Sequence, residues 1–165
     1  MDAYTPDMMD TQATEMTKGF EGFRPDIYED TEGKRTIGHG FNIDDPTVAK
    51  LLPKDVLSGK RPLELEESNQ IFTKLYIRAY KDAEGAVGEG WGRLPPQIKN
   101  IVVDMTYNMG GTKIKKFKEM IKALNKADFD KAGAEMVDSK WYGQVGDRSG
   151  KLYDMMMKPN MRPPR

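Results

Sequence analysis

Carboxylates are the side chains of this sequence with the clearest catalytic potential. Glu21 and Asp30 are separated by eight residues, over which the chain changes from a helical pattern to residues typical of strands. Hydrolysis of a glycosidic bond needs one acid to protonate the leaving oxygen and a second group across a cleft to stabilise charge or activate water. An acid at the end of a helix and another in the next strand or turn suit this chemistry. With 26 acidic residues in the chain, the spacing alone also fits two solvated surface acids.

The sequence offers few groups for other kinds of catalysis. It has no cysteine, which excludes disulfides, thiolate metal sites and a cysteine nucleophile. The single histidine, His39, lies between two glycines and has no HExxH-type partner, so we interpret it as a structural residue. The phosphate-binding patterns GxGxxG and GxxxxGK[ST] are both absent. We therefore predict no metal site and no cofactor.

Charge and hydropathy limit the expected partners. The 26 basic residues balance the 26 acidic ones, and the pI is about 6.6, unlike that of a strongly basic nucleic-acid-binding protein. No stretch approaches the roughly 18 apolar residues of a membrane-spanning helix. The first residues lack the basic start and apolar run of a signal peptide. We expect no nucleic-acid partner and no membrane insertion.

The N-terminal part of the chain must position the two carboxylates. Residues 1–10 have the composition of an irregular arm, and a helix is predicted to begin at Asp10 or Thr11 and to end near Gly22. Strand formers punctuated by glycines predict a small antiparallel sheet over residues 24–43. Such a sheet is too small to be stable alone.

The rest of the chain has helical patterns. Apolar residues at helical spacing predict one long helix over 64–84, followed by a glycine-rich break over 85–92. Pro95 and Pro96 predict the start of the next helix, and further helices follow. The fold class is therefore α+β, a small N-terminal antiparallel sheet joined by a long helix to a helical C-terminal lobe. A chain of 165 residues fits a single domain.

The residues around the two acids resemble the active-site segment of the phage-type lysozymes, the T-even phage lysozyme family (glycoside hydrolase family 24). The catalytic signature of that family is Glu, eight residues, Asp, five residues, Thr, and Glu21, Asp30 and Thr36 match it without a gap. The matching run comprises Glu21, Gly22, Phe23, Arg24, Ile27, Tyr28, Asp30, Thr31, Glu32, Gly33, Thr36, Ile37, Gly38 and Gly40.

A second stretch, from Gln97 to Arg148, is similar to the helical lobe of the same family. Within it, Tyr107 matches an aromatic position on the cleft side, which implies a sugar contact. Arg148 matches an arginine that contacts the catalytic Glu, which implies a supporting role. Trp141 also matches, but a tryptophan in a helical lobe is more often a core residue than a ligand.

One departure from the family concerns Phe20 and Phe41. Many members carry an acid and a histidine at these two positions, whereas this chain has two aromatic residues. Replacing a buried ion pair by packed apolar groups is often neutral or stabilising. We therefore expect a compensated exchange in which the two rings touch, with centroids within about 7 Å.

The resemblance implies a lysozyme-like domain over 1–165: an irregular arm (1–10), an N-terminal lobe with the active-site segment (11–62), a connecting helix (63–84) and a helical lobe (85–165). It also implies a muramidase that cleaves the β-1,4 bond between N-acetylmuramic acid and N-acetylglucosamine in bacterial peptidoglycan. Glu21 would donate the proton, and Asp30 and Thr36 would position the attacking water, with inversion. Carboxyl groups roughly 6.5–9.5 Å apart leave room for that water.

The biological setting follows from the same resemblance. We expect a monomeric endolysin that stays in the host cytoplasm until a holin releases it to the periplasm and cell wall. Two alternatives remain open at this point. One is a catalytically silent lysozyme-like domain that binds the wall or forms part of a phage tail, and the other is an enzyme of the same fold that acts on another polysaccharide such as chitin.

Overall fold

The structure is a computed structural model that describes residues 4–158. The chain divides into two compact units, Met1–Arg78 (the N-terminal unit) and Ala79–Arg165 (the C-terminal unit). The division falls within the long helix α4 (Leu65–Val87). The first three residues of the predicted arm lie outside the described residues, and the rest of it contains one short 3-10 helix, η1 (Pro6–Met8).

Helix α1 (Thr11–Glu21) has the ends that its sequence predicts. The Asp10 side chain caps it by accepting hydrogen bonds from the backbone amides of Gln12 (2.9 Å) and Ala13 (3.3 Å). Gly22 ends it with a φ of 70°, a conformation that glycine adopts without steric cost. Glu21 is therefore the last residue of the helix.

The predicted small antiparallel sheet is confirmed, with three strands in the order β1-β2-β3. The strands are β1 (Arg24–Glu29), β2 (Arg35–Gly38) and β3 (Phe41–Asn42). Tyr28 on β1 pairs with Thr36 on β2, and Ile37 on β2 pairs with Phe41 on β3. Because side chains alternate across a strand, this register fixes which residues share a face.

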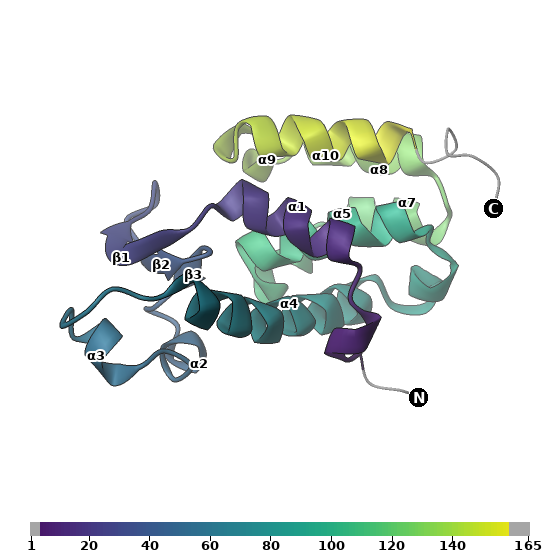
Figure 1. Ribbon diagram of the computed structural model, residues 1–165. Coiled ribbons are helices and arrows are strands. Elements are labelled where there is room, and N and C mark those ends of the chain that lie inside the picture. Colours follow the sequence, from purple (N-terminus) through teal and green to yellow (C-terminus); the bar gives the residue numbers. More distant parts are fainter. Residues whose placement is uncertain (1–3, 159–165) are drawn as a thin grey trace. The chain divides into compact units, whose positions relative to one another are not determined.

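The rest of the N-terminal unit contains two short helices, α2 (Pro46–Ala49) and α3 (Lys54–Leu57), and the first part of α4 (Figure 1). Its core consists of side chains that are at most 7% exposed: Ile37, Phe41, Ile43, Val48, Leu52, Val56, Leu63, Ile71, Phe72, Leu75 and Tyr76. The amide of Leu63 donates to the carbonyl oxygen of Pro25 (2.9 Å), which joins the approach to α4 to strand β1.

Helix α4 differs from its prediction at the C-terminal end. The sequence predicts a break from Gly85 onward, but α4 continues through Gly85 to Val87. A glycine inside a helix costs only about 1 kcal/mol relative to alanine, and burial of Val87 (4% exposed) favours the extra turn. Gly88, with a φ of 82°, is the residue at which the α-helical path ends.

The C-terminal unit is helical, as predicted (Figure 1). After α4 it contains η2 (Gly88–Arg93), α5 (Pro96–Met109), α6 (Gly111–Ile114), α7 (Lys118–Asn125), α8 (Phe129–Val137), α9 (Lys140–Gln144) and α10 (Asp147–Met157). Helix α5 begins at Pro96, where a proline is expected, and its Ile98, Ile101, Val102 and Met105 are completely buried. Together the two units confirm the α+β fold class. Among the described residues, no helix is long and apolar enough to span a bilayer.

Candidate active site

The carboxylate of Glu21 rests on the backbone of Gly40. A methyl group built on Gly40 would lie 2.8 Å from Cδ of Glu21 and closer still to Oε1. Gly40 also has a φ of 75°, a value that favours glycine. The end of α1 and the turn after β2 therefore meet at Glu21, and a side chain at position 40 would require the Glu21 carboxylate to move.

Asp30 begins the turn that joins β1 to β2, and backbone amides hold its carboxylate. Its Oδ1 accepts hydrogen bonds from the amides of Glu32 (2.9 Å) and Lys34 (2.8 Å). Its own amide donates to the carbonyl oxygen of Lys34 (2.9 Å), and its carbonyl oxygen accepts from Gly33 (3.0 Å). The local hydrogen bonds of a short hairpin thus fix the second carboxylate.

Thr36 lies at the start of β2, and its side chain is buried, with 4% exposed. Its hydroxyl donates to the carbonyl oxygen of Lys34 (2.9 Å). The carbonyl oxygen of Lys34 thus accepts a hydrogen bond from Thr36, and the amide of Lys34 donates one to Asp30. One residue of the turn is therefore bonded to both side chains. This shared anchor keeps Asp30 and Thr36 together.

Tyr28 lies on β1 between the two predicted acids in the sequence, and no role was predicted for it. Its pKa is raised, first by burial and then by the negative charge of Glu21, with a further contribution from Asp30. Arg24 opposes this shift, and its guanidinium lies 4.0 Å from the centroid of the phenol ring. Tyr28 is thus paired with Thr36 in the sheet, and the charges of both predicted acids raise its pKa.

His39 is buried, with 5% exposed, in agreement with its interpretation as a structural residue. Its Nδ1 lies 2.7 Å from Oγ of Ser68 on α4, and its ring lies among those of Phe23, Phe41 and Phe72. Burial is the main cause that lowers the pKa of His39. The ring contact predicted between Phe20 and Phe41 stays a prediction.

The other two predicted residues, Tyr107 and Arg148, belong to the C-terminal unit. Tyr107 is half-buried on α5. Arg148 on α10 is 7% exposed and donates from Nε and Nη2 to the two carboxylate oxygens of Asp104, at 2.8 and 3.0 Å. The sugar contact of Tyr107 and the support that Arg148 gives to Glu21 stay predictions.

Trp141 is a core residue, as the sequence analysis expected. It is 6% exposed, its Nε1 donates to Oδ1 of Asn108 (2.9 Å), and its ring packs edge-on against Phe117.

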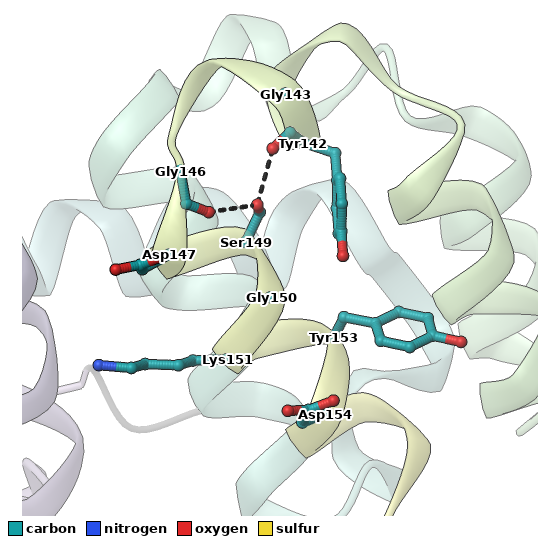
Figure 2. A pocket seen from close by; sticks show the side chains of 9 residues that line it. All are labelled: Tyr142, Gly143, Gly146, Asp147, Ser149, Gly150, Lys151, Tyr153 and Asp154. Atoms are coloured by element: carbon teal, nitrogen blue, oxygen red, sulfur yellow. Dashed lines mark hydrogen bonds between the residues drawn. The ribbon is translucent and has the colours of Figure 1, made fainter.

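An open depression of about 460 Å³ lies on α9 and α10 (Figure 2). Tyr142 and Tyr153 present their rings there, 6.4 Å apart. The Ser149 hydroxyl is directed at the backbone, 2.7 and 2.8 Å from the carbonyl oxygens of Tyr142 and Gly146. None of the five predicted site residues lines this depression. Across residues 4–158, no three histidine or acidic side chains gather as ligands for a metal ion.

The model of the family described as phage lysozyme matches residues 18–155 of this chain. The chain belongs to this family. The matched range contains Glu21, Asp30, Thr36, Tyr107 and Arg148, and it confirms the family resemblance and the lysozyme-like fold.

Three curated proteins are similar to this chain. Probable T4-type lysozymes 2 and 1 of Dictyostelium discoideum are 28% and 26% identical, covering 84% and 86% of this chain and 89% and 91% of their own lengths. The pre-baseplate central spike protein Gp5 of Enterobacteria phage T4 is 27% identical over 95% of this chain, which spans 29% of Gp5. Family membership supports a lysozyme-type glycoside hydrolase.

Proposed function

We propose that this protein is a muramidase that hydrolyses the β-1,4 bond between N-acetylmuramic acid and N-acetylglucosamine in bacterial peptidoglycan. The observation that carries the proposal is the placement of Glu21 and Asp30. Glu21 is the last residue of α1, and its carboxylate lies against Gly40. Asp30 accepts hydrogen bonds from the amides of the β1–β2 turn, and the charges of both acids raise the pKa of Tyr28.

In the proposed reaction, Glu21 protonates the oxygen of the leaving sugar while the glycosidic C–O bond breaks. Thr36 already donates its only hydroxyl proton to Lys34, so its oxygen can only accept a hydrogen bond from a water molecule. Asp30 would accept the other proton of that water. The water oxygen would then attack the anomeric carbon from the opposite face, Asp30 would take up the released proton, and the configuration would invert.

The test is the release of new reducing ends from purified peptidoglycan by the wild type, Glu21→Gln and a control variant, Glu29→Gln. Glu29 is an exposed acid on β1, so the control makes the same chemical change in the same hairpin. We expect activity in the wild type and in Glu29→Gln and near-complete loss in Glu21→Gln. Activity in Glu21→Gln would remove Glu21 as the acid, and a folded but inactive wild type would overturn the proposal.

Further measurements refine the proposal. NMR of the first-formed product should show the inverted anomer, and activity should persist in EDTA because no cofactor is proposed. Tyr107→Ala should raise KM if Tyr107 contacts sugar, and Arg148→Lys should lower kcat if Arg148 supports Glu21. Chitin assayed in parallel tests the alternative polysaccharide.

We also propose that the protein acts as a monomeric endolysin, held in the host cytoplasm and released by a holin to the periplasm and cell wall. Expression with and without a holin tests this proposal, because lysis should require both proteins. Sedimentation should give the mass of one chain.

The match to Gp5 favours a second candidate, a lysozyme-like domain that serves as part of a phage tail structure. The peptidoglycan assay separates the two. A folded wild type that sediments with peptidoglycan but releases no reducing ends would support the structural role.

A further inference from the structure

The turn between β2 and β3 consists of His39 and Gly40, and Gly38 before it is the last residue of β2. Both glycines have positive φ values, 65° and 75°. A methyl group on Gly38 would lie 2.8 Å from Oγ of Ser68, while one on Gly40 would meet the carboxylate of Glu21. The backbone thus passes close to the Ser68 side chain of α4 at Gly38 and close to the Glu21 carboxylate at Gly40.

The side chain of His39 is buried in the interior of the N-terminal unit. Its Nδ1 is 2.7 Å from Oγ of Ser68, a residue 29 positions away that is completely buried. The imidazole ring lies 5.5 Å from the ring of Phe23, 6.3 Å from that of Phe41 and 5.9 Å from that of Phe72, measured between centroids. A buried hydrogen bond among apolar rings is costly to leave unmade, so it specifies one position for the turn.

We propose that His39 is a positioning residue for the reaction: its hydrogen bond to Ser68 fixes the turn to α4 and thereby sets where the Glu21 carboxylate rests on Gly40. His39 acts through the turn and is not assigned a contact with the substrate. The inference rests on the proposed role of Glu21 as the acid. A displacement of about 1 Å at a catalytic group can reduce turnover on the order of 100-fold, so the placement of Gly40 matters to the rate.

The surroundings of His39 favour its neutral form. Burial lowers its pKa first and the charge of Lys18 lowers it further, whereas Glu15 raises it. Lys18 and Glu15 both lie on α1, while the neighbours on α4 and the hairpin, Ser68 and the phenylalanines, are uncharged. At neutral pH the hydrogen bond to Ser68 therefore involves an uncharged imidazole.

Three variants separate positioning from stability. Ser68→Ala and His39→Phe each remove one partner of the hydrogen bond, and His39→Phe keeps an aromatic ring in place. The double variant replaces both partners by apolar groups, which is close to neutral for stability. Thr73→Ala is the matched control, because it removes a hydroxyl on α4 that donates to the carbonyl oxygen of Asn69 in the same helix.

We expect kcat on peptidoglycan to fall about 10- to 100-fold in all three variants, with KM unchanged. The pH profile of kcat should also shift in all three, because Glu21 sits differently on Gly40. Thr73→Ala should keep the wild-type kcat and profile. A loss of kcat that follows the folded fraction and disappears in the stable double variant would overturn the inference.

A second readout needs no activity. Carbon-13 NMR of the Glu21 carboxyl and the amide resonance of Gly40 should shift in the three variants and not in Thr73→Ala. If the wild type does not cleave peptidoglycan, the proposed function fails, and the NMR comparison still decides whether His39 sets the position of Glu21. Unchanged resonances in Ser68→Ala and the double variant would overturn the inference.

Discussion

Each unit contains a buried polar pair that joins segments far apart in the sequence. In the C-terminal unit the pair is charged, because Arg148 on α10 binds both carboxylate oxygens of Asp104 on α5. In the N-terminal unit it is a hydrogen bond between His39 and Ser68, and it holds an irregular turn against α4. The first pair links two regular helices. The second fixes a turn whose backbone is not held by the hydrogen bonds of a helix or a strand.

This difference predicts how the two units respond to change. In the C-terminal unit, helical hydrogen bonds and buried apolar side chains already specify the backbone, so a lost polar contact should reduce mainly stability. In the N-terminal unit, contacts of single residues place the proposed catalytic groups, so a small change should affect the rate more than stability.

Asp104→Ala should cause the largest loss of stability, about 3–5 kcal/mol, because it leaves the Arg148 guanidinium buried without its carboxylate. Urea denaturation measures the effect. Asp130→Ala, which removes an exposed acid from α8, is the control and should change stability little. Equal effects of the two substitutions would contradict a structural role for the buried pair.

Gly40→Ala should reduce activity on the order of 100-fold because its methyl group displaces Glu21, and it should also cost about 1–2 kcal/mol of stability from the positive φ. The matched control is Gly59→Ala, which has a φ of 78° but open space around the added methyl group. Both variants should lose similar stability, measured by thermal unfolding, and only Gly40→Ala should lose activity. A similar loss of activity in both would refute the positional argument.

Tyr28 should report the charge of Glu21. Because that charge contributes to the raised pKa of Tyr28, Glu21→Gln should lower this pKa, although burial keeps it above its ordinary value. Carbon-13 NMR of the phenol carbon measures the titration. Glu29→Gln is the control, since adjacent side chains on a strand point to opposite faces, and it should leave the titration unchanged. An unchanged pKa in Glu21→Gln would mean that the two side chains are not close.

The smallest effect is expected at the surface of the N-terminal unit. Arg61 donates to both carboxylate oxygens of Glu67, at 2.8 and 2.9 Å, and this contact lowers the pKa of Glu67 from 4.5 to about 2. A lowered pKa stabilises the fold above pH 4.5, and the contribution is lost as the pH falls toward 2. Glu67→Gln should therefore lower Tm slightly at neutral pH, and its effect should shrink as the pH falls from 4.5 toward 2.

Glu66→Gln, at an exposed neighbouring acid, is the control for this pH dependence. A constant difference in Tm between the wild type and Glu67→Gln across the acid range would show that the carboxylate form of Glu67 is not what stabilises the fold.

Features that depend on neighbouring residues could be predicted from the sequence. The start of α1 follows from the cap at Asp10, its end from Gly22, and the start of α5 from its prolines. Glu21, Asp30 and Thr36, together with the residues around them, indicated the family that the comparison then confirmed. The end of α4 was predicted too early because burial of Val87 outweighs the low helix propensity of Gly85.

How the candidate site is held depends on contacts between elements that are distant in the sequence. The sequence determined the residue types and their order along α1 and the hairpin, because capping, turns and strand alternation act over a few positions. It did not pair His39 with Ser68, 29 residues away, or place Gly40 beneath Glu21, because such contacts depend on how separate elements pack. The proposed catalytic residues could therefore be identified from a short stretch of sequence, whereas their positions depend on packing between elements distant in the chain.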